Sequence, residues 1–339
     1  MMAKFIVYKL AFIFILSLVG CGNMFTKNKT KFHWLATESA PKNYPMRIIN
    51  GTFYYHNEKG GLYVPTAASI GHFWGTGEST HVVGEDFKPL PDRLDIRFFS
   101  FTENKLYQGS FDLPYEKILA LFKEGVARDK ESPIFNRMMV GVAPGGAVAV
   151  WVRGRGETRE VFFGQAEPYE DDLFDITQRK INDRDDYVRR NIIEMIGVEK
   201  LTDIEKNGVP FGLWEKYRTP YKWATILRTE KKLSNDTKYS FFNGESYRLD
   251  YPFSKDVLNA SRPLPLLIGF GCYIEDTSKQ YFFVVRFDEK ELYEAFDKLG
   301  GTEELVNIEI EPFLPKNLTK VRLYNSKGSI ELQHYKSEM

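Results

Sequence analysis

The five histidines of the sequence do not predict a metal site. None belongs to a HExxH motif or to a compact set with cysteine, which are the spacings that hold zinc. His72 and His81 flank the segment 73–80 and could approach each other, but two imidazoles without a carboxylate make a poor zinc site. We therefore predict no metal ion and no diffusible cofactor. The histidines stand at positions 33, 56, 72, 81 and 334.

The sequence also lacks two usual motifs of nucleophilic and nucleotide-hydrolysing enzymes. It contains no GxSxG and no GxxxxGK[ST] pattern. The glycines of 75–79 (GTGES) suit a tight turn, but no helical pattern follows them, as a phosphate-binding loop would require. Neighbouring carboxylates at 170–172 and 185–186 have polar surroundings, where burial is not expected to raise a pKa. These patterns favour a binding protein, and an enzyme whose site no motif reveals is the alternative.

The sequence around Cys21 predicts a specific covalent modification of this residue. Lys4 and Lys9 precede an apolar run over 10–19 and the small residue Gly20, which is the layout of an export signal. The run is about ten residues, well below the roughly twenty that span a bilayer. Leu18-Val19-Gly20-Cys21 resembles the lipobox of bacterial lipoproteins, so we expect cleavage between Gly20 and Cys21 and lipid on Cys21. The alternative is an ordinary secretory signal that happens to end near a cysteine.

A lipidated Cys21 would hold the chain on a membrane. Burying acyl chains contributes about 0.8 kcal/mol per methylene, and two or more chains bind stably. Gly22 follows the cysteine where an Asp would commonly direct retention on the inner membrane, so we expect the outer membrane and a periplasm-facing body. Residues 21–31 carry three lysines and little apolar surface, which is typical of a flexible tether.

Composition narrows the classes of partner. Lys plus Arg equals Asp plus Glu at 46 each, so no net charge favours nucleic acid. About 320 residues follow the signal, enough for two ordinary domains or one large one. Cys272 would be the only cysteine besides Cys21, and its apolar neighbours predict a buried thiol rather than a nucleophile.

Two stretches, 92–163 and 264–333, share one order of elements: strand, strand, helix, then three strands. In the first copy we expect strands over 96–101 and up to 111, and a helix that Asp112 starts and Gly125 stops. Ile118, Leu121 and Phe122 would form its buried side. The strands that follow it are expected at 138–143, 147–153 and 158–163.

In the second copy we expect strands at 266–274 and 281–287, a turn at 275–278, and three later strands at 306–311, 320–324 and 329–333. Asp288 and Glu291 have the spacing of a capping box for the helix between them. Its buried face would be Leu292, Ala295, Phe296 and Leu299, and Gly300 and Gly301 would end it. The copies could also extend upstream, with 77–79 (GES) matching 244–246 (GES), although common β-patterns also align by chance.

These patterns predict an α+β fold that is mainly antiparallel β, with two tandem sheet units, one packed helix in each, and a helical connector. The expected divisions are a signal peptide (1–20), a lipidated tether (21–31), a first β-rich domain (32–165), a charged helical connector (166–210) and a second β-rich domain (211–339). The charged connector is more typical of a solvated, half-docked helix than of a binding element.

Three stretches together resemble the lipoprotein family called domain of unknown function 2931. They are GHFWGTGES from Gly71, LPDRLDIRFFSFTENKLYQGSFDLPYEKILALFKEG from Leu90, and GVAPGGAVAVWVRG from Gly141. The resemblance is strongest over 32–165. It implies a cell-envelope lipoprotein, and members are often encoded near type VI secretion effectors, especially lipases. It carries over no catalytic residues.

The resemblance therefore implies an immunity protein that binds and neutralises an incoming effector of the lipase class. The alternative is a structural or assembly lipoprotein of the outer membrane without catalytic activity. The loops expected to meet a protein partner are 71–80 and 143–146, with Trp74, Glu78, Pro144 and Gly145 as the named candidates. The competing interpretation of Trp74 is that it packs in the core.

Overall fold

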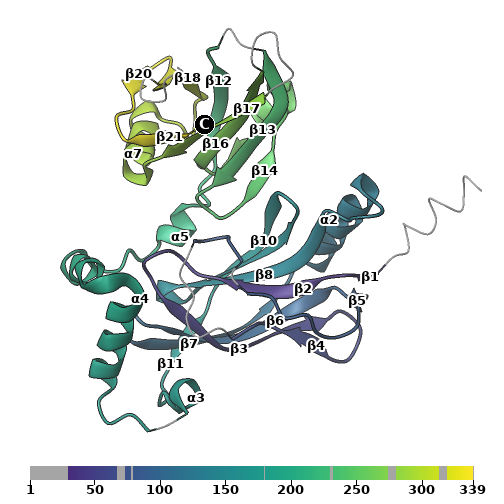
Figure 1. Cartoon of the computed structure of the whole chain (residues 1–339), viewed down its shortest axis with the longest axis vertical. Helices are drawn as coiled ribbons and strands as arrows, with labels where there is room; N and C mark the ends of the chain where they lie inside the picture. Colours follow the sequence, from purple (N-terminus) through teal and green to yellow (C-terminus); the bar gives the residue numbers. More distant parts are fainter. Residues whose placement is uncertain are drawn as a thin grey trace, which may run out of the picture.

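The computed structural model describes residues 30–66, 73–77, 79–178, 180–229, 232–273, 280–312 and 319–338. The predicted sites at Gly20, Cys21 and Glu78 and the turn 275–278 lie outside these residues. The described chain forms two halves that meet along a narrow junction near α5 (Leu213–Lys216), β10 (Glu157–Gln165) and β14 (Ser246–Arg248) (Figure 1).

The first half is built from two large sheets that enclose a core, and a separate two-stranded sheet pairs β1 (Lys31–Phe32) with β5 (Lys88–Pro89). Its further strands are β2 (Leu35–Ser39), β3 (Met46–Tyr55), β4 (Gly61–Tyr63), β6 (Pro91–Ser100), β7 (Lys105–Asp112), β8 (Phe135–Ala143), β9 (Ala147–Gly154) and β11 (Glu167–Tyr169). One sheet has the order β2-β8-β9-β10, with β2 parallel to β8. The other has the order β11-β7-β6-β3-β4 and is antiparallel.

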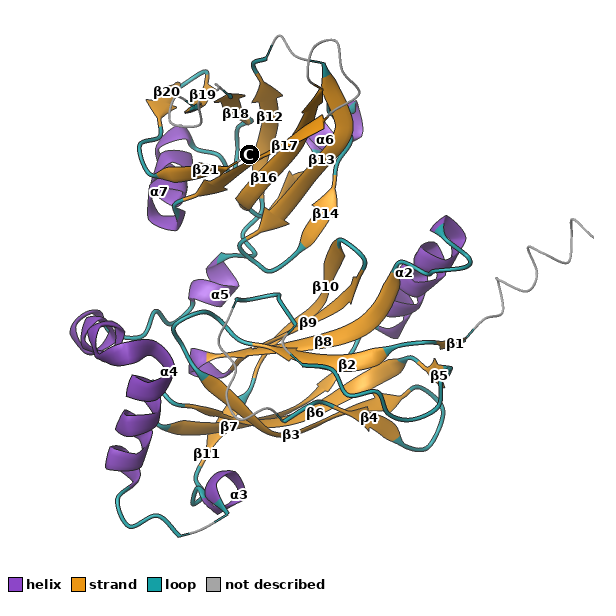
Figure 2. Ribbon diagram, in the orientation of Figure 1, coloured by secondary structure: helices purple, strands orange, loops and turns teal. Residues whose placement is uncertain are grey.

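The second half repeats this topology. Its further strands are β12 (Tyr221–Leu227), β13 (Leu233–Phe241), β15 (Ser261–Arg262), β16 (Pro265–Tyr273), β17 (Gln280–Phe287), β18 (Val306–Glu311), β19 (Lys320–Asn325), β20 (Gly328–Glu331) and β21 (Tyr335–Glu338). The order β15-β12-β18-β19-β20, with β12 parallel to β18, matches β2-β8-β9-β10 apart from the added edge strand β15. The order β21-β17-β16-β13-β14 matches β11-β7-β6-β3-β4. The predicted fold class and repeat are therefore confirmed (Figure 2).

One pair of strands joins the two halves into a nine-stranded sheet. Thr158 of β10 pairs with Ser246 of β14, so the β2 sheet of the first half continues into the β13 sheet of the second. The repeat extends upstream, because β2, β3 and β4 match β12, β13 and β14, but the predicted correspondence of 77–79 with 244–246 is wrong. Residues 244–246 lead from β13 into β14, which matches the turn between β3 and β4, whereas Gly77 and Ser79 follow β4.

The main helix of each half follows the second hairpin strand, as expected. These helices are α2 (Tyr115–Arg128) and α7 (Glu289–Leu299). The prediction that Asp112 starts α2 is wrong, because Asp112 still pairs with Arg93 in the sheet. The helix begins after Pro114, which disfavours helical conformation in the residue before it.

Gly125 does not stop α2, which continues to Arg128. A Cβ atom at Gly125 would lie 3.0 Å from Phe135 Cδ2 and 3.1 Å from Phe135 N. The glycine is therefore explained by close packing of the helix against the start of β8 rather than by a helix end.

Both ends of α7 lie where the sequence predicts them, but one contact of the predicted capping box differs. The Asp288 side chain accepts a hydrogen bond from Glu291 N at 3.0 Å, Gly300 closes the helix at φ +65°, and the four expected core residues are buried. The reciprocal half of the capping box is wrong. The Glu291 carboxylate accepts from the backbone N–H groups of Gln333 and His334, each at 2.8 Å, so it fixes the chain before β21.

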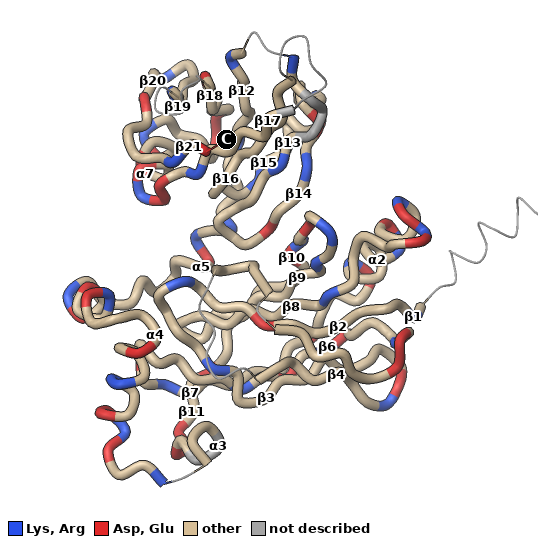
Figure 3. Tube along the Cα trace, viewed as in Figure 1, with Lys and Arg blue, Asp and Glu red and all other residues tan. Residues whose placement is uncertain are grey.

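Residues 166–210 contribute to the first half. They supply β11 and the helices α3 (Phe174–Thr177) and α4 (Arg184–Asn207), which bends at Gly197 (φ +82°). Buried residues of α4, including Val188 and Ile192, pack with Phe99 of β6. Charged residues of both signs occur in both halves and are frequent on α4 (Figure 3).

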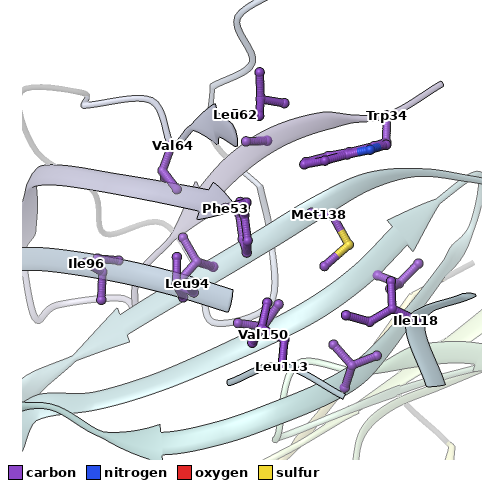
Figure 4. Close-up of a cluster of buried hydrophobic side chains, with 14 of the residues drawn as sticks. Trp34, Phe53, Leu62, Val64, Leu94, Ile96, Leu113, Ile118, Met138 and Val150 are labelled. Atoms are coloured by element: carbon purple, nitrogen blue, oxygen red, sulfur yellow. The ribbon is translucent and has the colours of Figure 1, made fainter. Parts of the chain in front are cut away.

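The first core lies between the two sheets and under α2, where Trp34, Phe53, Leu94, Met138 and Val150 meet (Figure 4). Strands β8 and β9 are apolar along nearly their whole length because their outer face is covered as well. The second half has its own core, which includes the buried thiol of Cys272. The remaining short helix is α6 (Lys255–Asn259).

Candidate functional site

A cleft of about 570 Å³ lies where residues 73–76 of the first half meet α5 and the β13–β14 turn of the second. Its lining comes from segments far apart in the sequence. They include Lys42, Tyr44, Phe73, Trp74, Arg153, Trp214, Tyr217, Lys238, Phe242, Glu245, Arg286 and Glu289.

Two glycines allow the halves to approach each other at this cleft. A Cβ atom at Gly75 would lie 2.3 Å from Gly244 Cα, and one at Gly244 would lie 3.0 Å from the Trp151 ring. Both residues have positive φ, +76° and +87° respectively, which glycine adopts without steric cost. No larger residue fits this contact without moving the backbone.

Aromatic rings from both halves continue the junction. Trp74 meets Trp151 edge to face, with ring centroids 4.9 Å apart and planes at 83°. Its ring also lies 6.5 Å from that of Trp214, which contacts Tyr44 at 5.7 Å. The indole nitrogen of Trp151 donates to the carbonyl of Asn243 at 3.2 Å. These contacts hold the cleft wall in a fixed shape.

Phe73 is the solvent-exposed aromatic residue of this wall. Its side chain is 48% exposed, whereas the buried Trp151 and Trp214 are 0% and 2% exposed. Ser39 Oγ donates to Phe73 O at 3.1 Å, and Lys42 Nζ lies 5.3 Å from the ring centroid. A rigid, accessible aromatic ring beside a cation is typical of a residue that anchors a partner.

The charges lining the cleft are unequal. Four cationic side chains, Lys42, Arg153, Lys238 and Arg286, face the two carboxylates Glu245 and Glu289. Tyr217 OH donates to Glu289 at 2.8 Å, and burial raises the pKa of Glu289. The cleft therefore favours a ligand with negative charge.

An ion pair between the halves lies beside the cleft. Arg218 Nε donates to Glu160 Oε1 at 2.5 Å, and Glu245 accepts from the Glu160 backbone N–H at 3.0 Å. Burial raises the pKa of Glu160 to about 7, against the opposing effect of Arg218. Its other oxygen, Oε2, has no hydrogen-bond partner in the described part of the chain. This buried carboxylate is a titratable link between β10 and the second half.

The structure separates the two loops that the sequence singles out. Trp74 lines the cleft but is also packed in the aromatic junction. Pro144 and Gly145 do not line it: Pro144 is buried in the turn η1 (Pro144–Gly146), and Gly145 N donates to Glu103 Oε2 at 2.9 Å. The exposed Phe211 lies against Gly145, where a Cβ would be 3.1 Å from its ring.

Sequence reasoning missed Phe73, Tyr44, Trp214 and Arg153. Aromatic residues are frequent throughout this chain, so their type alone does not distinguish them. Phe73 stands beside the predicted Trp74, and the local signal that could have found it is an apolar pair in a glycine-rich loop. The others come together only through the contact between the halves.

A metal site and a membrane-spanning helix each have requirements that the described residues do not meet. No group of three or more His, Cys, Asp or Glu side chains among them could hold a metal ion. No helix in that part of the chain is long and apolar enough to cross a membrane.

A family model described as "Protein of unknown function (DUF2931)" matches residues 23–212. Neither a curated protein nor a solved structure is significantly similar to the chain. The family match covers the first half, the α4 connection and the entrance to α5. Since it spans more than half of the sequence, the chain belongs to the DUF2931 family of proteins of unknown function.

Proposed function

We propose that this chain is a lipoprotein of the outer membrane, facing the periplasm, that binds a protein partner in the cleft between its halves. The partner proposed is a toxin delivered by type VI secretion, of the lipase class, which the chain neutralises as an immunity protein. The observation that carries the binding role is the exposed Phe73 on a rigid aromatic wall.

The shape of the cleft supports a protruding loop of the partner as its occupant. Partner-binding energy concentrates in a few aromatic and arginine residues set in well-packed surroundings. Phe73 supplies such a ring, while Trp74 and Trp214 behind it are held by contacts with both halves. Little side-chain ordering is then needed on binding.

The charge of the cleft supports an acidic segment. Lys42 and Arg286 contribute positive charge, while the carboxylate of Glu289 is engaged by Tyr217. Complementary charge increases the association rate and discriminates against basic partners. We therefore expect the bound loop to carry Asp or Glu.

The proposed lipid on Cys21 would place this cleft where the toxin meets its substrate. Residues 21–31 would act as a tether, and tethering raises the effective concentration of the inhibitor at the membrane. A Cys21→Ala variant should incorporate no labelled palmitate and should leave the membrane fraction. Continued labelling of that variant would contradict a lipid anchor at Cys21.

The immunity role is tested with the effector encoded beside this chain. A periplasmic form without signal and lipid should co-purify with that effector and should protect cells that produce it in the periplasm. Failure of both would exclude immunity. Recovery of outer-membrane assembly proteins in place of the effector would instead support the structural role.

A further inference from the structure

Two arginines of the first half face each other across neighbouring strands. Arg137 of β8 pairs directly with Arg153 of β9, after a bulge at Asn136. Both side chains are half-buried, and they line a pocket of about 260 Å³ together with Thr37, Gly77, Thr80 and Asn136. The pocket lies on the outer face of the β2-β8-β9-β10 sheet.

Neither arginine has a carboxylate partner within the described residues. Arg137 Nη1 donates to the carbonyl of Asn136 at 3.0 Å, and neither guanidinium forms an ion pair with another described residue. Burial lowers the pKa of Arg153, and the charge of Arg137 lowers it further. Burial also lowers the pKa of Arg137.

Other arginines of the first half are neutralised by carboxylates. Arg128 and Arg159 both contact Glu157, and Arg155 on the next turn contacts Asp129 at 2.6 Å. Two adjacent like charges that are partly removed from water destabilise the fold unless a counter-ion joins them. Arg137 and Arg153 therefore form a site that an anion would complete.

We propose that this pocket binds the phosphate group of a phosphate monoester. The two guanidinium groups, the hydroxyls of Thr37 and Thr80 and the Asn136 amide can donate hydrogen bonds into one small volume. A phosphate dianion balances both positive charges and accepts from several directions, whereas a carboxylate offers one charge and two oxygens. Arginine is suited to phosphate binding because the N–H groups of its planar guanidinium group match the spacing of two phosphate oxygens.

The phosphate could belong to a soluble ester or to a lipid headgroup. A chain held at a membrane surface would meet both. The chemistry at Arg137 and Arg153 is the same for either source. Because Arg153 also lines the cleft, the binding tests use the chain without a protein partner.

The test uses the full-length chain in detergent, titrated calorimetrically with inorganic phosphate, glycerol 3-phosphate and succinate. Phosphate compounds should bind at one site, and Arg137→Gln and Arg153→Gln should each weaken binding by about tenfold or more. The matched control is Arg155→Gln, because its side chain is 64% exposed and lies outside the pocket. Its affinity should equal that of the unchanged chain.

A stability measurement separates binding from a structural role. Without phosphate, Arg153→Gln should unfold at the same or a higher temperature than the unchanged chain, because an uncompensated charge is removed. Added phosphate should raise the Tm of the unchanged chain and leave that of Arg153→Gln unmoved. A lower Tm for Arg153→Gln in phosphate-free buffer would overturn the site.

Vesicles containing phosphatidic acid distinguish the two sources. If glycerol 3-phosphate displaces the chain from these vesicles, the pocket binds the monoester from either source. If the vesicles bind but the soluble phosphates do not, and Arg153→Gln weakens vesicle binding, the ligand is a lipid headgroup. The proposal is overturned if succinate binds more tightly than phosphate. It is also overturned if neither the soluble phosphate compounds at millimolar concentration nor the phosphatidic acid vesicles bind.

Discussion

The backbones of Gly75 and Gly244 are in contact, so that a Cβ atom on Gly75 would lie 2.3 Å from Gly244 Cα. This contact joins the loop that carries Phe73 and Trp74 to the turn between β13 and β14. It sets the width of the cleft, because no side chain separates the two segments.

Replacing Gly75 with alanine should therefore open the junction. The matched control is Gly156→Ala, because Gly156 has the same φ of +76° and nothing lies within 4 Å of its added Cβ. Both variants carry the strain of positive φ, and Gly75→Ala adds a clash that should cost about 1–3 kcal/mol more. Urea unfolding measures the difference, and equal losses for the two variants would show that the contact is absent in solution.

The link between Glu160 and Arg218 should make stability depend on pH. Because burial raises the pKa of Glu160 from 4.5 to about 7, the folded chain holds this proton more tightly than the unfolded chain. The contribution of Glu160 is fully present below about pH 4.5 and is lost as the pH rises through about 7. Glu160→Gln should remove this dependence.

The measurement is the difference in Tm between Glu160→Gln and the unchanged chain, recorded from pH 4.5 to 8. Taking the difference cancels the opposite trend of carboxylates whose pKa is lowered, such as Glu157. The variant should become relatively more stable as the pH rises. A difference that falls with rising pH would mean that the Glu160 pKa is depressed.

Gly125→Ala tests why α2 contains a glycine. In an open helix this change stabilises by about 1 kcal/mol. Here the added methyl group would lie 3.0 Å from the buried ring of Phe135, so we expect no gain or a loss. In a Phe135→Leu background, Gly125→Ala should cost less stability than it costs in the unchanged chain. A gain of about 1 kcal/mol from Gly125→Ala in the unchanged chain would contradict the packing argument.

The two acidic residues at the start of α7 should each contribute to stability. Asp288→Ala removes the N-cap and should cost about 1 kcal/mol. Glu291→Ala removes the acceptor of two backbone N–H groups before β21 and should cost a similar amount. Glu294→Ala, whose side chain is 54% exposed on the same helix, is the control and should change stability by less than about 0.5 kcal/mol. Equal effects at Glu291 and Glu294 would rule out the tie to β21.

Local patterns were sufficient to predict both helices and the ends of α7, but not the ends of α2. The cap at Asp288, the apolar stripe from Leu292 to Leu299 and the stop at Gly300 all depend on neighbours within one or two turns. The limits of α2 depend on Pro114 and on the packing of Gly125 against β8, and the second of these is a tertiary contact. Glu291 likewise serves a distant strand instead of its own helix end.

The cleft and the arginine pocket could not be predicted in the same way. Phe73 and Trp214 line one cleft through the arrangement of the halves, which contacts such as the β10–β14 pairing and that of Gly75 with Gly244 determine. Arg137 lies opposite Arg153 because the register set by the turn at 144–146 runs unbroken from Ala143–Ala147 back to this pair. The rest of the pocket comes from Thr37 of β2 and from the loop residues Gly77 and Thr80, which only the tertiary structure brings to the two arginines.

The central claim, that a protein partner binds at the cleft, is tested most directly by the Kd for the effector encoded beside this chain. Phe73→Asp should raise that Kd by about tenfold or more, because it removes the accessible ring and adds negative charge to a site proposed for an acidic loop. Phe87→Asp, at a residue 54% exposed that does not line the cleft, should leave the Kd within about twofold. Equal Kd values for both variants and the unchanged chain would contradict binding at the cleft.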